Sequence, residues 1–296
     1  MIPMAKPLCI QDQIINLKGK GLVFKNEKNA QRFLLNNNYY RLKAYMLPFQ
    51  DNTLPDKPFI NKIYFEDILD IYNFDSKLRT LIFSATGKIE IALRNQIIHR
   101  YSIAYGEQWH LDETYFKKTL VHSEFIKKLN DVITRSQEKF MIHHRIKNPS
   151  LDIDCWVSLE VISFGELSKM FENLKADRCK MNVVIHFGAQ STRILENWLY
   201  RISVIRNICA HHGCLWNREL KDIILPKKLP SPFISNITIP NNKIYSSICC
   251  ILYLLNMIEP QNNFKNEFKN LLSLYPSINL KQMGFPNNWE SEMFWQ

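Results

Sequence analysis

The sequence is poor in glycine and lacks a hydrophobic run long enough to span a bilayer. Only eight of its 296 residues are glycine, and its apolar residues recur at helical spacing, which predicts a helical protein. The most apolar stretch, residues 244–258, contains Ser246, Ser247 and Asn256 and is too short to cross about 30 Å of hydrocarbon. We therefore interpret it as a buried helix and expect no membrane association.

A disulfide framework and a secretion signal are also missing. The seven cysteines are odd in number and irregularly spaced, which fits a reducing cytosol better than a disulfide scaffold. The apolar residues at positions 1–17 are interrupted by Lys6, Pro7, Gln11 and Asp12, so they do not form a signal-peptide core. These features predict a cytoplasmic protein.

Acidic residues are the minority charge. The chain has 38 lysines and arginines against 28 aspartates and glutamates, a net charge of +10, which favours a polyanionic partner without choosing between nucleic acid and an anionic membrane. A soluble basic protein without such a partner is the alternative. The most basic window, residues 117–147, has an apolar side that contains Phe125, Leu129, Val132, Ile133 and Phe140, so one helix could direct its cations outward. We expect these cations to contact RNA phosphates: Lys117, Lys118, Lys127, Lys128, Arg135, Lys139, Arg145 and Lys147.

The sequence is organised around the run Arg206-Asn207-Ile208-Cys209-Ala210-His211-His212. Upstream, apolar residues recur at steps of three and four, so the run lies at the end of an amphipathic helix. Gly213 is the expected left-handed residue that ends this helix. The negative end of the helix dipole favours a protonated imidazole, which suits histidine to proton transfer.

The helical register separates the roles of these residues. At 100° per residue, Asn207 and His211 share an outward face, while Arg206 lies at the margin of the buried stripe. His212 falls on the buried stripe and is interpreted as a supporting core histidine.

This run resembles the Arg-x4-His signature of HEPN-type helical ribonucleases, and its longer form resembles Abi proteins of the AbiD/AbiF type. Further blocks with similar residues occur in the same order, and together they cover residues 20–220. These blocks are Asn38-Tyr39-Tyr40-Arg41-Leu42-Lys43-Ala44-Tyr45, Tyr72-Asn73-Phe74-Asp75-x-x-Leu78-Arg79, Ile89-Glu90-Ile91-Ala92-Leu93-Arg94-Asn95 and Trp156-x3-Glu160-x2-Ser163-Phe164-Gly165-x-Leu167-Ser168.

The resemblance implies an all-α, HEPN-like helical bundle that acts in phage defence by abortive infection. Metal-independent RNA cleavage needs two proton-transfer groups and positive charge on the phosphorane. In the HEPN family two copies of the motif meet in a homodimer. Here that implies His211 for proton transfer, Arg206 for phosphate charge and Asn207 for positioning, with no cofactor.

A second copy of the register occurs at Arg94, Asn95 and His99. It is either a second catalytic half within one chain or a brace for the first motif, and we favour the brace. Glu160 is expected to support the site by pairing with Arg206 or Arg94, because a buried guanidinium needs a partner.

The expected organisation has three parts: an N-terminal helical segment at 1–58, a core with both motifs at 59–220, and a proline-rich linker with a helical segment at 221–296. Residues 65–99 predict one long helix, or two with a bend near Asp75 or Gly87. Arg41 and Lys43 are expected to extend the RNA-binding surface, and the tyrosines near them predict either RNA stacking or core packing.

Two other functions compete with the nuclease. The region around Cys209 to Cys214 crowds possible zinc ligands together, but it lacks the paired spacings of zinc sites, so we expect no metal. The second alternative is a non-catalytic protein that binds a structured non-coding RNA. Binding of a structured RNA is favoured in either case, because A-form RNA is recognised by its shape and backbone.

Overall fold

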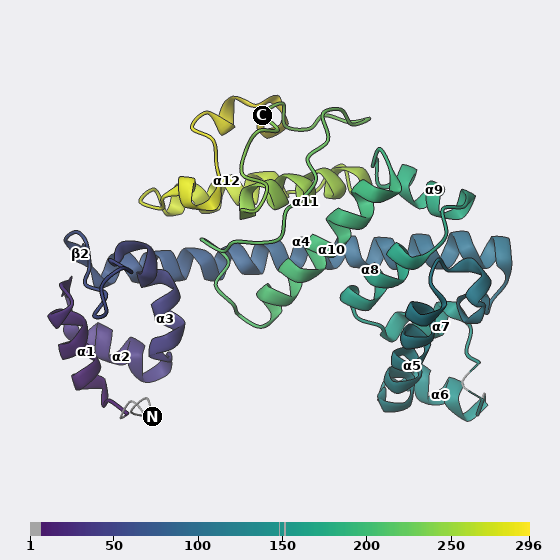
Figure 1. Cartoon of the computed structure of the whole chain (residues 1–296), viewed down its shortest axis with the longest axis horizontal. Helices are drawn as coiled ribbons and strands as arrows, with labels where there is room; N and C mark the ends of the chain where they lie inside the picture. Colours follow the sequence, from purple (N-terminus) through teal and green to yellow (C-terminus); the bar gives the residue numbers. More distant parts are fainter. Residues whose placement is uncertain (1–6, 148, 151) are drawn as a thin grey trace.

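The computed structural model describes residues 7–147, 149–150 and 152–296, and one long helix runs through its centre (Figure 1). This helix, α4, spans Phe65–Tyr105 without interruption. Its 41 residues correspond to about 60 Å at 1.5 Å per residue. The structure confirms the all-α fold and has one helix where the sequence allowed two.

Local chemistry explains where α4 begins and ends. The Asp67 carboxylate accepts a hydrogen bond from the Tyr64 backbone amide at 2.9 Å, which satisfies a donor that the helix leaves free. Glu66 accepts from the amides of Lys25 and Asn26 and so ties the start of α4 to the preceding segment. Gly106, with φ of +92°, ends the helix in a conformation that suits glycine.

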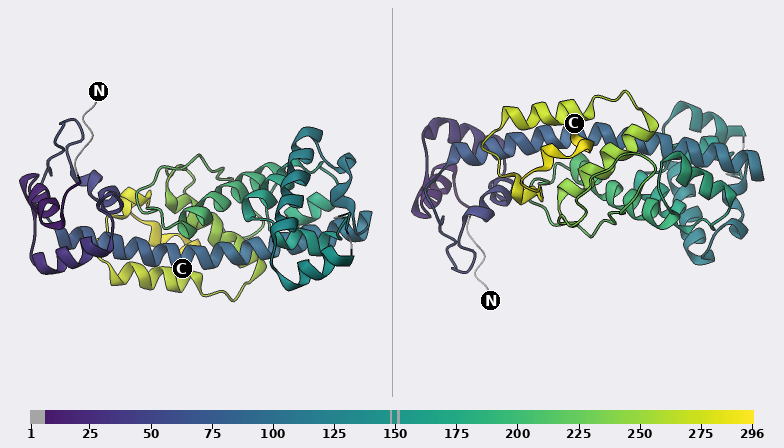
Figure 2. Two further views of the ribbon diagram at one scale, coloured as in Figure 1. Left: turned by 90° about the horizontal axis from the view of Figure 1, so that it is seen from below. Right: turned by 90° about the horizontal axis from the view of Figure 1, so that it is seen from above.

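Two lobes project from the same side of α4, one at each end (Figures 1 and 2). The N-terminal lobe contains α1 (Ile10–Gly19), α2 (Glu27–Asn36) and α3 (Tyr39–Met46). The other lobe contains α5 (Thr119–Arg135) and α6 (Lys139–Lys147). The end of α10 (Thr192–Ala210) lies between the lobes, and α11 (Ile244–Ile258) and α12 (Phe264–Leu274) lie on the opposite side of α4. The remaining helical elements are α7 (Cys155–Ser158), α8 (Phe164–Asn173), α9 (Arg178–His186), η1 (Leu47–Phe49), η2 (Trp109–Leu111), η3 (Glu113–Tyr115), η4 (Leu159–Val161), η5 (Leu280–Met283), η6 (Trp289–Ser291) and η7 (Met293–Trp295).

The basic window was expected to form one helix and is broken, and two later helical stretches are broken as well. The basic window forms α5 and α6, residues 153–171 form α7, η4 and most of α8, and residues 244–274 form α11 and α12. At α8 the cause is a cap: the Ser163 hydroxyl accepts from the Glu166 amide at 3.3 Å, so a new helix starts there. Periodicity missed these breaks because the apolar spacing continues across them. The parallel strands β1 (Leu22–Val23) and β2 (Ile63–Tyr64) were also not expected.

One continuous hydrophobic core joins all three expected parts of the chain, from Ile14 to Trp295. The first six residues of the expected 1–58 segment lie outside the described residues. The final aromatic residues Trp289, Phe294 and Trp295 are buried, and the Trp295 indole donates to the Tyr245 hydroxyl at 3.0 Å. The C-terminal segment therefore packs on α11. No helix in the described part of the chain is long and apolar enough to cross a bilayer.

A buried lysine connects α8, α9 and α10. Lys180 is fully buried, and its ammonium group donates to the Leu174 carbonyl at 2.8 Å and pairs with Glu196 at 2.6 Å. Burial lowers the pKa of Lys180 to about 8, although the Glu196 carboxylate opposes the shift. The unfolded chain therefore binds this proton more tightly than the folded chain does between pH 8 and the usual lysine pKa near 10.4.

We predict that the charged form of Lys180 costs stability below pH 8 and that this cost is relieved as pH rises from 8 towards 10.4. Urea midpoints of wild type and Lys180→Met are compared at about pH 7.5 and about pH 9.5, which lie below and above the folded pKa. The midpoint of wild type should rise relative to that of Lys180→Met between these two pH values. Lys175→Met, which changes an exposed lysine, should show no such trend. A difference that is constant with pH would contradict the shifted pKa.

Candidate active site

The two arginine motifs meet at one buried carboxylate, Glu90, to which the sequence analysis gave no role. Glu90 on α4 accepts from the Arg94 guanidinium at 2.9 Å, and its other oxygen lies 3.5 Å from Nη2 of Arg206 on α10. Arg94 also donates to the Ile162 carbonyl at 2.9 Å, and its Nη1 lies 3.8 Å from Glu160. Glu160 therefore pairs with Arg94, while Glu90 takes the position beside Arg206 that was considered for Glu160.

Arg206 is partly exposed and is held from three sides. Besides Glu90, its guanidinium donates to the Asn207 side-chain oxygen at 3.2 Å and lies 5.7 Å from the centre of the Phe83 ring. Asn207 and His211 are exposed, in agreement with the face that the helical register predicts. The three residues of the motif are thus accessible to a ligand.

The end of α10 differs from the expected cap. His212, with φ of +55°, is the left-handed residue, so the prediction that Gly213 takes this conformation was wrong. The side chain of His212 is exposed, so its interpretation as a core histidine was also wrong. The Gly213 amide donates to the Ile208 carbonyl at 2.8 Å and the His212 amide donates to Cys209 at 3.1 Å, the pattern of a Schellman motif. A Cβ on Gly213 would lie 3.2 Å from the Ile208 side chain, a close approach that favours glycine at this position.

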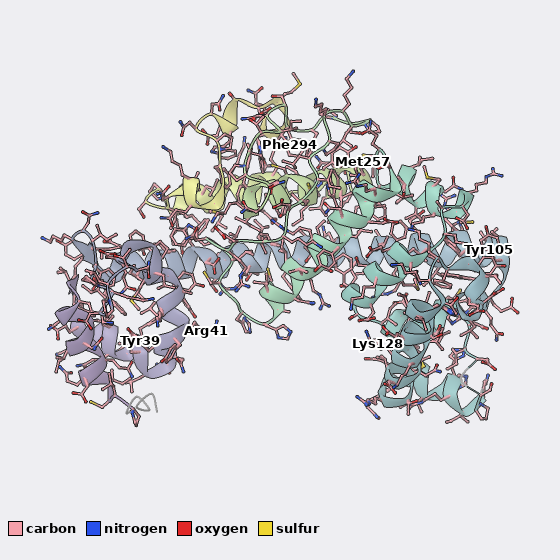
Figure 3. The ribbon with its side chains drawn as sticks, in the orientation of Figure 1. Tyr39, Arg41, Tyr105, Lys128, Met257 and Phe294 are labelled. Atoms are coloured by element: carbon pink, nitrogen blue, oxygen red, sulfur yellow. The ribbon has the colours of Figure 1, made fainter. Side chains whose placement is uncertain are left out.

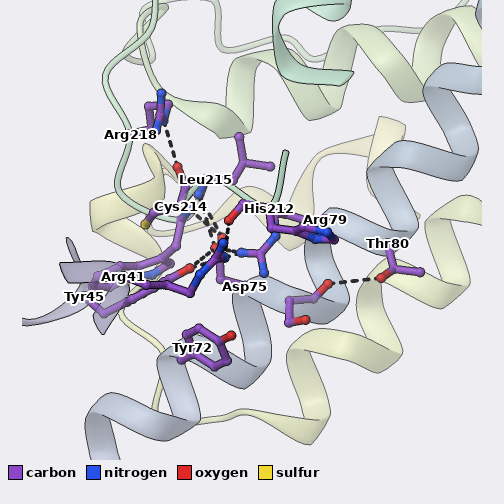
Figure 4. A network of polar contacts seen from close by, with 12 residues as sticks. Arg41, Tyr45, Tyr72, Asp75, Arg79, Thr80, His212, Cys214, Leu215 and Arg218 are labelled. Carbon is purple, nitrogen blue, oxygen red and sulfur yellow. Dashed lines mark hydrogen bonds and ion pairs between the residues drawn. The ribbon is translucent and has the colours of Figure 1, made fainter. Parts of the chain in front are cut away.

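A buried aspartate fixes the loop that follows the motif (Figure 4). Asp75 on α4 accepts from the Trp216 amide at 2.7 Å, the Leu215 amide at 3.2 Å and the Tyr45 hydroxyl at 2.6 Å, and it pairs with Arg79. Burial raises the pKa of Asp75, while the Arg79 guanidinium and the other donors oppose that shift. Every one of these partners donates, which suits a carboxylate.

The loop is also held from the N-terminal lobe. Arg41 donates to the His212 carbonyl at 2.6 Å, so a residue expected to bind RNA makes a structural contact next to the motif. Lys43 lies 5.4 Å from the Tyr40 ring centre. Tyr45 is buried and therefore has the core role, while Tyr40 is exposed and its stacking on RNA stays a prediction.

Only one residue of the second motif lies beside the first motif. Arg94 lies beside the Glu90–Arg206 pair, and Asn95 and His99 are exposed. His99 follows Glu90 by nine residues on α4, about 14 Å along the axis. The chain after Arg206 runs towards the start of α4, as the hydrogen bond from the Leu215 amide to Asp75 shows. The structure thus brings Arg94 to Arg206 but does not bring His99 to His211.

Part of the expected basic surface is occupied by structural contacts. Lys117 pairs with Glu196 and Lys128 pairs with Glu166, each at 3.2 Å, and Arg145 donates to the Ile133 carbonyl at 2.9 Å. Counting charges within residues 117–147 could not reveal the first two ion pairs, because Glu196 and Glu166 lie outside that range. Figure 3 shows Arg41 and Lys128 on the inner sides of the two lobes. The other expected cations, Lys118, Lys127, Arg135, Lys139 and Lys147, are exposed.

The cysteines near the motif are not activated. Burial raises the pKa of Cys209 to about 12 and that of Cys214 to about 11, so both are neutral thiols at physiological pH. A zinc site needs thiolates and neutral imidazoles that converge. Within the described ranges, no three His, Cys, Asp or Glu side chains come together in a way that suits a metal ion.

The model of the family described as Abi-like protein matches residues 32–217. The chain belongs to the Abi-like family. This membership suggests abortive infection, a form of phage defence. No curated protein and no solved structure shows significant similarity to the chain.

The Abi-like match contains every residue of the arginine cluster and the Asp75 network, including two acids that sequence reasoning passed over. Asp75 and Glu90 each precede an arginine by four residues on the apolar face of α4. An acid and an arginine one turn apart on a buried stripe require each other. This spacing of an acid and an arginine could have identified Asp75 and Glu90 from the sequence.

We predict that Asp75→Ala destabilises the protein by about 3–5 kcal/mol, because it leaves the Arg79 guanidinium buried without a counter-charge. The amides of Leu215 and Trp216 lose their acceptor in the same variant. Asp70→Ala removes an exposed acid from the same helix and should change stability by less than about 0.5 kcal/mol. Urea unfolding monitored by circular dichroism measures both, and equal effects would show that the Asp75 network contributes no special stability.

Proposed function

We propose that this Abi-like chain is an RNA-binding abortive-infection protein and a metal-independent endoribonuclease toxin that acts through Arg206 and His211. The observation that carries the proposal is the position of Arg206. Glu90 holds it beside a second guanidinium, that of Arg94, while Asn207 and His211 remain exposed at the end of α10. The partly exposed Arg206 guanidinium is thus the one available to a phosphate group.

Each side chain has a distinct part in the proposed reaction. His211 removes the proton from a ribose 2′-hydroxyl or protonates the leaving 5′-oxygen. Arg206 neutralises the charge that develops on the phosphorane. Asn207 accepts from the Arg206 guanidinium and so orients it. Arg94 is largely buried and acts by fixing Glu90.

One chain supplies a single copy of the Arg206–His211 motif at this position, so we propose a homodimer that brings a second copy beside it. An exposed face of α4 next to Arg206 supports this arrangement. Phe83 and Ile91 are 43% and 66% exposed and lie two helical turns apart, with Gly87 between them. A Cβ on Gly87 would meet nothing within 4 Å, so the packing of the chain itself does not require glycine there.

We predict that His211→Ala abolishes RNA cleavage and toxicity but leaves RNA binding nearly unchanged. The loss of a general acid or base costs about 100-fold to 10,000-fold in rate. His99→Ala is the matched control, because it removes the exposed histidine of the second motif, and it should retain activity. Toxicity that survives His211→Ala, with RNA still bound, would instead favour the non-catalytic protein that binds a structured non-coding RNA.

Mixing inactive subunits tests whether the site is shared. Heterodimers of Arg206→Ala and His211→Ala chains contain one composite site with an intact arginine and histidine, so we expect partial recovery of cleavage. Ile91→Asp, which places a charge on the proposed interface, should yield monomers in sedimentation and lose activity. A fully active monomer would refute the shared site.

We predict that the exposed cations of α5 and α6 contribute to RNA affinity mainly through phosphate contacts. Changing Lys118, Lys127 and Lys139 together to Gln should lower the slope of log affinity against log salt by about 2 to 3, since each contact contributes roughly 0.7 to 0.9. A variant with Lys227, Lys228 and Lys281 changed to Gln has the same net charge, and these exposed lysines belong to the C-terminal part. Equal slopes in the two variants would place the RNA elsewhere.

A further inference from the structure

A hollow of about 590 Å³ opens where α5 gives way to α6, and η4 forms its opposite wall. Its lining includes the apolar side chains Val132, Phe140 and Val161 and the charged side chains Arg135, Glu138 and Glu160. The hollow forms at the break between the two helices, residues 136–138. In one continuous helix, Phe140 would lie two turns beyond Val132 along the axis. The volume falls in the range of ligand pockets.

The hollow adjoins the arginine cluster through a shared residue. Glu160 lines the hollow, and one of its oxygens lies 3.8 Å from the Arg94 guanidinium. Arg94 in turn contacts Glu90, which contacts Arg206. A group that contacts Glu160 in the hollow is therefore separated from Arg206 by three side chains, those of Glu160, Arg94 and Glu90.

The walls of the hollow contain apolar groups that the fold leaves uncovered. Phe140 and Val132 were expected on the buried side of one helix, but they are 43% and 38% exposed. An exposed aromatic ring beside cations is the usual platform on which RNA bases stack. Arg135 in the lining and Lys139 next to Phe140 provide positive charge for the adjoining phosphates.

The polar lining selects among the bases. Glu138 and Glu160 offer only acceptors when ionised, so they favour a base edge with adjacent donors. Guanine has two such donors, N1–H and the N2 amino group, which can be received together by one carboxylate. Adenine and cytosine offer one amino group on that edge, and uracil offers one imide N–H.

We propose that this hollow is a guanine subsite, which receives one base of the bound RNA and places the neighbouring phosphate towards Arg206. Phe140 stacks on the base and Glu160 accepts from its Watson–Crick edge. The subsite rests on the proposed function and adds a sequence preference to it.

The test uses full-length His211→Ala protein, which leaves the RNA uncut, and fluorescence anisotropy with labelled oligouridine or the same oligomer with one central guanosine, adenosine or cytidine. We expect the guanosine oligomer to bind about tenfold more tightly than the others. Glu160→Gln should abolish that preference. Because Glu160 also contacts Arg94, Glu138→Gln provides a second variant without that contact, and it should reduce the preference as well.

Phe140 is tested separately from the carboxylates. Phe140→Ala should weaken binding of the guanosine oligomer by about fivefold or more, the usual effect of losing a stacked base, and Phe140→Tyr should restore it. Ile146→Ala is the control, because this exposed residue of α6 does not line the hollow.

The possible failures are distinguishable. Equal binding of all oligomers, or a preference for another base, would overturn the guanine subsite and leave the proposed nuclease intact. Guanosine monophosphate that binds the hollow as strongly as the RNA would assign the site to a free nucleotide and also overturn it. Loss of all RNA binding in the wild-type protein would overturn the proposed function together with the subsite.

Discussion

The Glu90 carboxylate lies between two guanidiniums, and the geometry of the candidate site depends on this contact. Arg94 reaches one of its oxygens from the same helix, and Arg206 reaches the other from α10. A lone buried charge of either sign would be costly, but each member of this group compensates another. The arginine of the motif is therefore held in one orientation by a residue that is distant in sequence, while its own neighbours Asn207 and His211 remain open to solvent.

A second acid on α4 has a comparable effect on the loop after the motif. Asp75 binds the backbone of Leu215 and Trp216, and the N-terminal lobe contributes Tyr45 to Asp75 and Arg41 to the His212 carbonyl. The lobe, the long helix and the end of α10 are thus joined at one point. Because α4 carries both acids, its continuity fixes the spacing between the arginine cluster and the loop.

The arginine cluster also connects the Arg206–His211 motif to the lobe that contains α5 and α6. Glu160 extends the chain of charges from Arg206 through Glu90 and Arg94 to the hollow between α5, α6 and η4. Exposed apolar groups, acceptors and cations coincide there, and three charged side chains connect the hollow to Arg206. This connection is the reason to propose that the two features belong to one RNA site.

The sequence by itself determined the helical class, the exposed face of Asn207 and His211, and the family, because these follow from local periodicity and from residues that are close along the chain. It also contained both acid–arginine pairs of α4, as charges one turn apart on an apolar stripe. Only the tertiary structure decided that Glu90 serves Arg206, that Lys117 and Lys128 are ion-paired, that Phe140 is exposed and that His212 turns outward. Each of these depends on which elements pack together, and contacts between residues distant in the chain leave no periodic signal in it.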